Sequence, residues 1–283
     1  MINLAEVWYR YPDAESPSLK GINLFAAPGE VVGVVGANGA GKTTLAKVLS
    51  GFLPHAEGGE LEGVIHVGDM NLRDVELADV VARVGLIVQN PFNQLSGAKH
   101  TVEGEIAFGL ENLGCPRAEM RKRVSAIADE LGISGLLGLS PFDLSGGQQQ
   151  LVALASILVM EPPAVVMDEP TAQLDPAGSR RVFELLDGLK AAGRSVVIFE
   201  HKLELLSERA DRILVLDEGR IVAGGKPELI LGDESLQRLG IGATRYTLAA
   251  RAARMRGLTG DQELPVSLGQ AVRYFRRGRA SDA

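Results

Sequence analysis

The segment Gly36 to Thr44, GANGAGKTT, has the residue types and spacing of a phosphate-binding loop. It follows the apolar run VVGVVG and opens the helical stretch TTLAKVLSG. Backbone N–H groups of such a loop, together with the positive end of the helix, can surround phosphate oxygens. We expect Lys42 to reach the β- and γ-phosphates and Thr43 to offer its hydroxyl to Mg²⁺. The predicted nucleotide-binding residues are Gly36, Asn38, Gly39, Ala40, Gly41, Lys42, Thr43 and Thr44.

A second segment, PAVVMDEP at 163–170, is an apolar strand that ends in two carboxylates. Asp168 could hold the Mg²⁺ shell, as the acidic residue at the end of a neighbouring strand does in P-loop NTPases. Glu169 would then lie one residue nearer the γ-phosphate and could polarise a water molecule. Taken alone, an acidic pair after a strand is as often a solvated turn. Its combination with the phosphate-binding loop favours the catalytic interpretation.

A third segment, LSGGQQQ at 144–150, precedes an apolar run. Two glycines followed by three glutamines weaken the start of a helix. We therefore expect these residues to serve a contact outside their own chain.

Composition limits the class of protein. The chain has 283 residues, of which 46% are hydrophobic and 23% charged, which predicts one or two globular domains. A lone cysteine, Cys115, excludes an internal disulfide framework and disfavours a zinc site. The longest apolar run is about half a membrane span and the N-terminus lacks signal-peptide features, so we expect no segment that crosses a bilayer. The net charge of −7 disfavours a broad nucleic-acid surface, although residues from Gly240 onward carry eight Arg against three acids.

The order of predicted elements indicates an α/β fold. Apolar β-branched runs alternate with helical stretches, which is typical of a largely parallel sheet covered on both faces; they lie at 31–36, 83–88, 164–168, 195–199 and 212–216. Runs at 2–10 and 22–25 predict an antiparallel edge. The pattern turns helical after Pro91, which predicts an inserted helical lobe at about 91–160. From Gly240 the chain is rich in Arg and Ala, and we expect two short helices around the break LTGDQELP.

Together, the phosphate-binding loop, LSGGQ and the strand ending in Asp-Glu resemble the ATP-binding cassette (ABC) family over residues 1 to about 235. The resemblance implies a nucleotide-binding domain at 1–235 and a C-terminal extension at 236–283 that serves subunit contact. It also implies ATP and Mg²⁺ as cofactors, and a dimer that closes around two MgATP. In that family the LSGGQ signature caps the γ-phosphate bound to the partner subunit; here the matching residues are Ser145, Gly146, Gly147 and Gln148.

The resemblance assigns four further positions. Tyr11 matches the aromatic that stacks on adenine, although Trp8 and Tyr9 compete with it and a packed edge-strand aromatic is the alternative. Gln89 matches the glutamine that reaches Mg²⁺ and the attacking water, with a solvent-facing strand end as the alternative. Asp175 matches the loop residue that crosses to the other subunit, and it also suits a helix N-terminus before Pro176. His201 matches the switch histidine, which contacts the γ-phosphate and orients Glu169 and water.

Two features depart from the family pattern. Leu151 stands where a basic residue is common. The stretch FEHKLE places Glu200 where a hydroxyl residue is usual, and Lys202 after the histidine.

Two further stretches, VQNPFNQLSG and DEPTAQLD, resemble energy-coupling factor transporter ATPases, which power uptake of vitamins or of cobalt and nickel. That resemblance implies a homodimer or a heterodimer with a related ATPase, a transmembrane energy-coupling subunit and a separate substrate-binding membrane subunit. The chain would then lie peripherally on the cytoplasmic face of the membrane.

Other members of the same family are the alternatives. An importer ATPase for another solute and a soluble cassette ATPase of iron–sulfur assembly both stay open. Chromosome-maintenance ATPases insert long coiled coils between the loop and the signature, whereas 102 residues without sustained heptads separate Lys42 from Ser145 here. Translation-factor types carry two cassettes in one chain, and this sequence has one.

Overall fold

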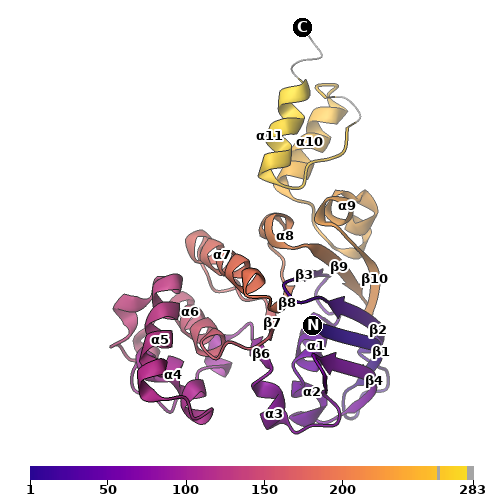
Figure 1. The fold of residues 1–283 in the computed structure, drawn as a ribbon. Coiled ribbons are helices and arrows are strands. Elements are labelled where there is room, and N and C mark those ends of the chain that lie inside the picture. Colours follow the sequence, from indigo (N-terminus) through magenta and orange to yellow (C-terminus); the bar gives the residue numbers. More distant parts are fainter. Residues whose placement is uncertain (260–261, 279–283) are drawn as a thin grey trace.

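A computed structural model describes residues 1–259 and 262–278 (Figure 1). Its central sheet has six strands in the order β10-β9-β3-β8-β7-β6. These strands are β3 (Val31–Val35), β6 (Val84–Ile87), β7 (Ala164–Asp168), β8 (Ser195–Phe199), β9 (Arg212–Asp217) and β10 (Arg220–Gly225). Five of them are parallel, and β10 is an antiparallel edge. Every residue of β3, β7 and β8 is buried, as expected for strands covered on both faces.

A second, antiparallel sheet has the order β2-β1-β4-β5. Its strands are β1 (Ile2–Arg10), β2 (Leu19–Ala26), β4 (Glu60–Val67) and β5 (Met70–Asn71). The sequence predicted β1 and β2 but missed β4. The first half of β4 alternates exposed and half-buried residues and contains Gly63 at φ 86°, so it lacks a sustained apolar pattern.

Two hydrophobic cores lie on opposite faces of the central sheet. Alternate residues of β3 divide between them, because successive side chains of a strand point to opposite faces. Val32 and Val34 pack with the antiparallel sheet and α1 (Lys42–Leu49). Val31 and Val35 belong to the core that includes the helical lobe and α7 (Pro176–Ala191). The phosphate-binding loop between β3 and α1 therefore follows a strand that is buried between the two cores.

The helical lobe lies to one side of the central sheet, away from the antiparallel sheet (Figure 1). It contains α4 (Val102–Asn112), α5 (Arg117–Leu131) and α6 (Gly146–Leu158), with short 3₁₀ turns at Pro91–Asn93, Ser134–Leu136 and Pro141–Asp143. Gly132 ends α5 in the left-handed conformation (φ 66°), as the sequence pattern predicted. The expectation of an inserted helical lobe is confirmed.

Smaller helices complete the chain. They are α2 (Phe52–His55), α3 (Leu77–Val81), α8 (Leu203–Arg209), α9 (Pro227–Gly232) and a 3₁₀ helix at Glu234–Leu239. The tail forms two helices, α10 (Arg245–Met255) and α11 (Leu268–Gly278), which lie side by side and project from the body (Figure 1). Two tail helices were predicted; residues 260–261 of the break between them, and 279–283, lie outside the described residues. In the part of the chain that the structure describes, no helix is long and apolar enough to span a membrane.

Candidate active site

The loop from β3 leads into α1, which begins at Lys42 with Gly41 before it. Gly41 has φ 104°, a conformation that L side chains rarely adopt, so glycine is required at this point. No side chain caps the helix start, and the first intrahelical bond runs from the Leu45 N–H to the Gly41 carbonyl. The N–H groups of the first turn therefore remain available to an anion at the positive end of the helix dipole.

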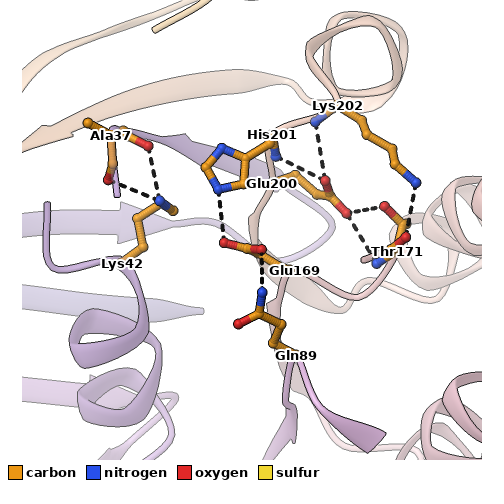
Figure 2. A network of polar contacts seen from close by, with 9 residues as sticks. Ala37, Lys42, Gln89, Glu169, Thr171, Glu200, His201 and Lys202 are labelled. Atoms are coloured by element: carbon orange, nitrogen blue, oxygen red, sulfur yellow. Dashed lines mark hydrogen bonds and ion pairs between the residues drawn. The ribbon is translucent and has the colours of Figure 1, made fainter. Parts of the chain in front are cut away.

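Lys42 lies under the loop and is only 6% exposed. Its Nζ donates to the carbonyl oxygens of Gly36, at 3.0 Å, and Ala37, at 3.1 Å (Figure 2). Burial lowers the pKa of Lys42, and the nearby carboxylates of Glu169 and Asp168 oppose that shift. A buried cation held only by carbonyl dipoles would gain a full countercharge from a bound phosphate.

One cleft of about 630 Å³ collects half of the predicted site residues. Its lining residues are Asn38, Gly39, Gly41, Lys42, Thr43, Thr44, Gln89, Glu169 and His201. They come from the phosphate-binding loop and α1, from the end of β6, and from the ends of β7 and β8. Because parallel strands present their carboxyl ends at one edge of a sheet, residues far apart in the sequence meet here.

Asp168, the last residue of β7, is 4% exposed. Burial raises the pKa of its carboxyl group, and a hydrogen bond with Thr43 is the largest influence that opposes the rise. Its Oδ1 has no hydrogen-bond partner. An unpartnered carboxylate oxygen beside a hydroxyl suits a hard cation, which prefers oxygen ligands. The residues present thus fit Mg²⁺, and Asp168 and Thr43 are the residues that would hold it.

Glu169 follows at once in a left-handed conformation (φ 48°) that is unusual for a residue with a side chain. Each of its carboxylate oxygens has one partner (Figure 2). Gln89 Nε2 donates to Oε2 at 2.8 Å, and His201 Nε2 lies 2.9 Å from Oε1. Side chains that follow β6 and β8, the two neighbours of β7, therefore fix this carboxylate at the cleft, where it could orient a water molecule.

The three candidate aromatics of β1 and the following turn have separate environments. Tyr9 is fully buried, and its hydroxyl donates to the Gly58 carbonyl at 2.8 Å. Trp8 packs under the Arg220 guanidinium. The Tyr11 hydroxyl lies 3.2 Å from Thr44 Oγ1, so Tyr11 adjoins the start of α1. Of the three, Tyr11 is the one placed beside the phosphate-binding loop, and its stacking on adenine stays a prediction.

The signature segment lies outside this cleft, at the start of α6. The expected contact of this segment with another chain stays a prediction, but its residues also bond within their own chain. Ser145 and Gln148 form a capping box: the Gln148 N–H donates to Ser145 Oγ at 3.4 Å and the Ser145 N–H to Gln148 Oε1 at 2.9 Å. Gln149 donates to the Pro141 carbonyl and Gln150 to the Val88 carbonyl. The segment thus begins a stable helix while Ser145 itself is exposed.

Asp175 lies at the start of α7 and, like the signature, does not line the cleft. Its Oδ1 accepts from the Gly178 N–H at 2.6 Å, with Pro176 as the first helical residue, so the predicted helix N-terminus is confirmed. The loop before it packs on the signature: a Cβ on Gly147 would lie 3.1 Å from the Gln173 carbonyl oxygen. Ser145 and Asp175 thus belong to neighbouring, exposed segments of one surface.

Sequence reasoning missed one buried network behind the cleft. Glu200 and Lys202 were noticed only as departures from the family pattern, yet both contact the segment around Thr171 (Figure 2). No sequence signal marks Thr171 as their partner, because contacts between the ends of different strands are tertiary.

Comparison with known proteins identifies the family and the fold. The ABC transporter family matches residues 19–172. An energy-coupling factor transporter ATP-binding protein, EcfA, from Methanosarcina acetivorans is 44% identical over 241 residues, 85% of each chain. The structure of cbiO1 from Clostridium perfringens, described as part of the ABC transporter complex cbiONQ, aligns with TM-score 0.72 and 28% identity over 100% of this chain and 98% of that one. A dimeric bacterial ABC transporter cassette aligns with TM-score 0.71 and 26% identity over 80% of this chain and 99% of that one.

The α/β fold, the phosphate-binding loop and the cleft at the strand ends therefore have one explanation. The chain belongs to the ABC transporter family and is an ATP-binding ATPase.

Proposed function

We propose that the chain dimerises around two MgATP and powers solute uptake through an energy-coupling factor type of transporter. The observation that carries the catalytic part is the grip of Gln89 and His201 on the Glu169 carboxylate in the same cleft as Lys42. The similarity to EcfA and to cbiO1 supports the transporter type. Vitamins or cobalt and nickel are the solute classes that such transporters import.

In this proposal the phosphate-binding loop and the first turn of α1 hold the triphosphate. Lys42 exchanges its two carbonyl partners for phosphate oxygens, while Asp168, Thr43 and Gln89 face the metal. Bound Mg²⁺ would neutralise phosphate charge. Glu169 accepts or orients the proton of the attacking water, and His201 keeps that carboxylate aimed at the γ-phosphate.

The signature supplies the second half of each site in trans. Ser145 keeps its hydroxyl hydrogen for an acceptor, because in the capping box its Oγ accepts a hydrogen bond. The N–H groups of Gly146 and Gly147 lie in the first turn of α6, where no intrahelical carbonyl is available to them. These donors suit a phosphate held by a partner subunit. The dimeric cassette with the same fold supports this arrangement.

The helical lobe offers a contact surface for a transmembrane energy-coupling subunit, which would work with a separate substrate-binding membrane subunit. Phe92 is 62% exposed and Phe142 is 60% exposed, and exposed aromatic side chains are enriched at protein–protein contacts. Phe92 lies three residues after Gln89, and Gln94 bonds the Val88 N–H and the Leu86 carbonyl, which ties this loop to β6. In this proposal the lobe contacts the transporter at the cytoplasmic face of the membrane. Movement of the lobe there would then shift Gln89 in the nucleotide cleft.

The C-terminal extension, 236–283 in this proposal, serves subunit contact. Within its described part, Leu248, Met255 and Phe275 expose apolar surface on α10 and α11, and none of its residues lines the nucleotide cleft. Truncation at Gly240 should weaken dimerisation and leave nucleotide binding intact; loss of nucleotide binding would contradict this assignment.

The test of the catalytic proposal is Glu169→Gln. The change keeps the size of the side chain but removes its charge and basicity, so turnover should fall by on the order of 10²-fold or more while MgATP binding survives. Steady-state hydrolysis and calorimetric titration measure the two quantities. Wild-type turnover in the variant would remove Glu169 from the mechanism.

The test of the transporter proposal is purification from membranes. The chain should co-purify with a polytopic membrane protein, and Phe92→Asp with Phe142→Asp should abolish that association while the purified chain still hydrolyses ATP. Undiminished association of the double variant would exclude this surface as the membrane contact.

A further inference from the structure

Glu200 is a buried carboxylate directly behind the catalytic cleft, 3% exposed and placed one residue after β8. Each of its two carboxylate oxygens accepts two hydrogen bonds. Oε1 accepts from the N–H of Thr171, at 3.2 Å, and from the hydroxyl of the same residue. Oε2 accepts from the N–H groups of His201, at 3.0 Å, and Lys202, at 3.2 Å. The carboxylate thus uses all four of its acceptor positions on donors of the protein.

These four donors belong to the two segments that carry the catalytic contact. Thr171 follows Glu169 by two residues, and His201 follows Glu200 directly. The bond between His201 Nε2 and Glu169 Oε1 and the bonds of Glu200 therefore close a ring of contacts, with Glu200 at its base (Figure 2). A shift of either segment would have to break bonds of a buried carboxylate, which are stronger than neutral hydrogen bonds.

Lys202 adds a second link between the same segments. Its Nζ donates to the Thr171 carbonyl at 3.0 Å and to Ser179 Oγ at 2.7 Å. Ser179 lies in the first turns of α7, whose N-terminus is capped by Asp175. The segment Thr171 to Asp175, which we propose crosses to the partner subunit, is therefore fixed to the histidine segment by both Glu200 and Lys202.

We propose that Glu200 is a positioning residue for ATP hydrolysis: it holds the backbone on both sides of the His201–Glu169 contact and so sets their alignment. This inference rests on the proposed catalytic function of Glu169 and His201. A hydroxyl residue, which resemblance to the family would favour here, has one oxygen and could not reach both segments with four bonds. Because these bonds form without nucleotide, the Glu200 carboxylate aligns His201 with Glu169 before ATP binds.

Glu200→Gln tests the proposal with almost no change in shape. A carboxamide has one acceptor oxygen, so its NH₂ group must face either the two N–H groups of His201 and Lys202 or the N–H of Thr171. At least one buried donor then loses its partner and the alignment loosens. We expect kcat to fall about 10-fold and the KM for MgATP to change less than about twofold. Glu208→Gln, on the exposed surface of α8, makes the same chemical change and should match wild type.

A double-mutant cycle separates positioning from general damage to the fold. If Glu200 acts through His201, then in a His201→Ala background Glu200→Gln should lower the rate by less than about twofold. Single-turnover hydrolysis of radiolabelled ATP can follow such slow variants. A full 10-fold effect in that background, or wild-type kcat for Glu200→Gln alone, overturns the proposal.

Thr171→Val provides an independent variant should Glu200→Gln lose its circular-dichroism signal. It removes one donor to Glu200 at nearly constant volume, and we expect about a threefold fall in kcat; a wild-type rate overturns the proposal. Glu169→Gln, measured alongside, distinguishes failure of the proposed function of the site from failure of the positioning role of Glu200. Wild-type turnover in Glu169→Gln contradicts the proposed function of the site, whereas inactive Glu169→Gln with fully active Glu200→Gln contradicts only the positioning role.

Discussion

The starts of α1 and α6 are two glycine-rich helix N-termini with opposite local chemistry. At α1 no side chain caps the helix start, and Lys42 Nζ donates to two backbone carbonyls of the preceding loop. At α6 the capping box of Ser145 and Gln148 already satisfies one N–H of the first turn, and Gly147 packs on Gln173. The N-terminus of α1 therefore has no side-chain cap, whereas the N-terminus of α6 is capped by its own residues and carries the exposed Ser145.

This difference bears on how one fold can carry two phosphate contacts. An open N-terminus with a buried lysine depends on an anion to satisfy its donors and charge, which suits the primary nucleotide site. A self-capped N-terminus is stable without a ligand and keeps a hydroxyl and two N–H groups for a transient partner. We therefore expect damage to α1 to abolish nucleotide binding, and damage to α6 to affect only assembly.

Lys42→Ala should give the largest effect. Among the described residues that line the cleft, Lys42 is the only lysine or arginine, so its removal should raise the Kd for ATP by about 10²-fold or more. Lys47→Ala on the same helix, where the lysine pairs with Glu57, is the control and should bind normally. Calorimetric titration measures both variants; unchanged affinity in Lys42→Ala would remove α1 from the primary site.

Asp168→Asn should separate metal binding from stability. Burial raises the pKa of Asp168 above its ordinary value of 3.8, so the native state binds the proton more tightly than the unfolded state. Stability therefore falls as pH rises through the window above 3.8, and the buried charge is a cost at neutral pH. We expect the unliganded variant to be at least as stable as wild type at pH 7, with the difference shrinking toward pH 4.

Thermal unfolding with ATP, with and without Mg²⁺, completes that test. Wild type should gain stability from Mg²⁺ and Asp168→Asn should gain less, because the carboxamide has no negative charge and only one oxygen to offer where the carboxylate has an unpartnered Oδ1. An equal Mg²⁺-dependent gain in both proteins would argue against Asp168 as a metal contact.

Ser145→Ala should give the smallest effect on the isolated chain. Loss of the cap on α6 should cost about 1 kcal/mol of unfolding free energy, measured by urea denaturation, with ATP affinity unchanged. Ser145→Asp, which keeps a capping oxygen, should retain wild-type stability. If Ser145→Ala weakens nucleotide binding by the isolated chain, α6 is not separate from the primary site.

Much of this comparison could be predicted from sequence, because local spacing determines it. The phosphate-binding loop between strand and helix, the acidic end of β7 and the glycine that ends α5 each depend on a few adjacent residues. Strand β10 was missed, since its residues alternate between exposed and half-buried without a buried face. The hydrogen bonds of Gln89 and His201 to Glu169 were only partly predictable. The role of Glu200 was not predictable, because one of its partners, Thr171, lies 29 residues away and the others are backbone N–H groups, which carry no sequence signal.

The capping box teaches a different lesson. Intrinsic propensities alone predict that SGGQ is unfavourable for a helix. Serine with glutamine three residues later is itself a helix-start signature, and it outweighs the glycines between them. The segment can therefore stabilise its own helix and still present donors to a partner.

In the proposed dimer, Ser145 at the start of α6 caps a phosphate bound by a second copy or by a related chain. Size-exclusion chromatography with light scattering, with and without MgATP, tests it on Glu169→Gln and on Glu169→Gln combined with Ser145→Asp. Blocked hydrolysis should trap Glu169→Gln as an ATP-dependent dimer. The added carboxylate preserves the helix cap but repels the γ-phosphate, so the double variant should bind MgATP and remain monomeric. An ATP-dependent dimer of the double variant, as abundant as that of Glu169→Gln, would show that Ser145 does not cap the γ-phosphate.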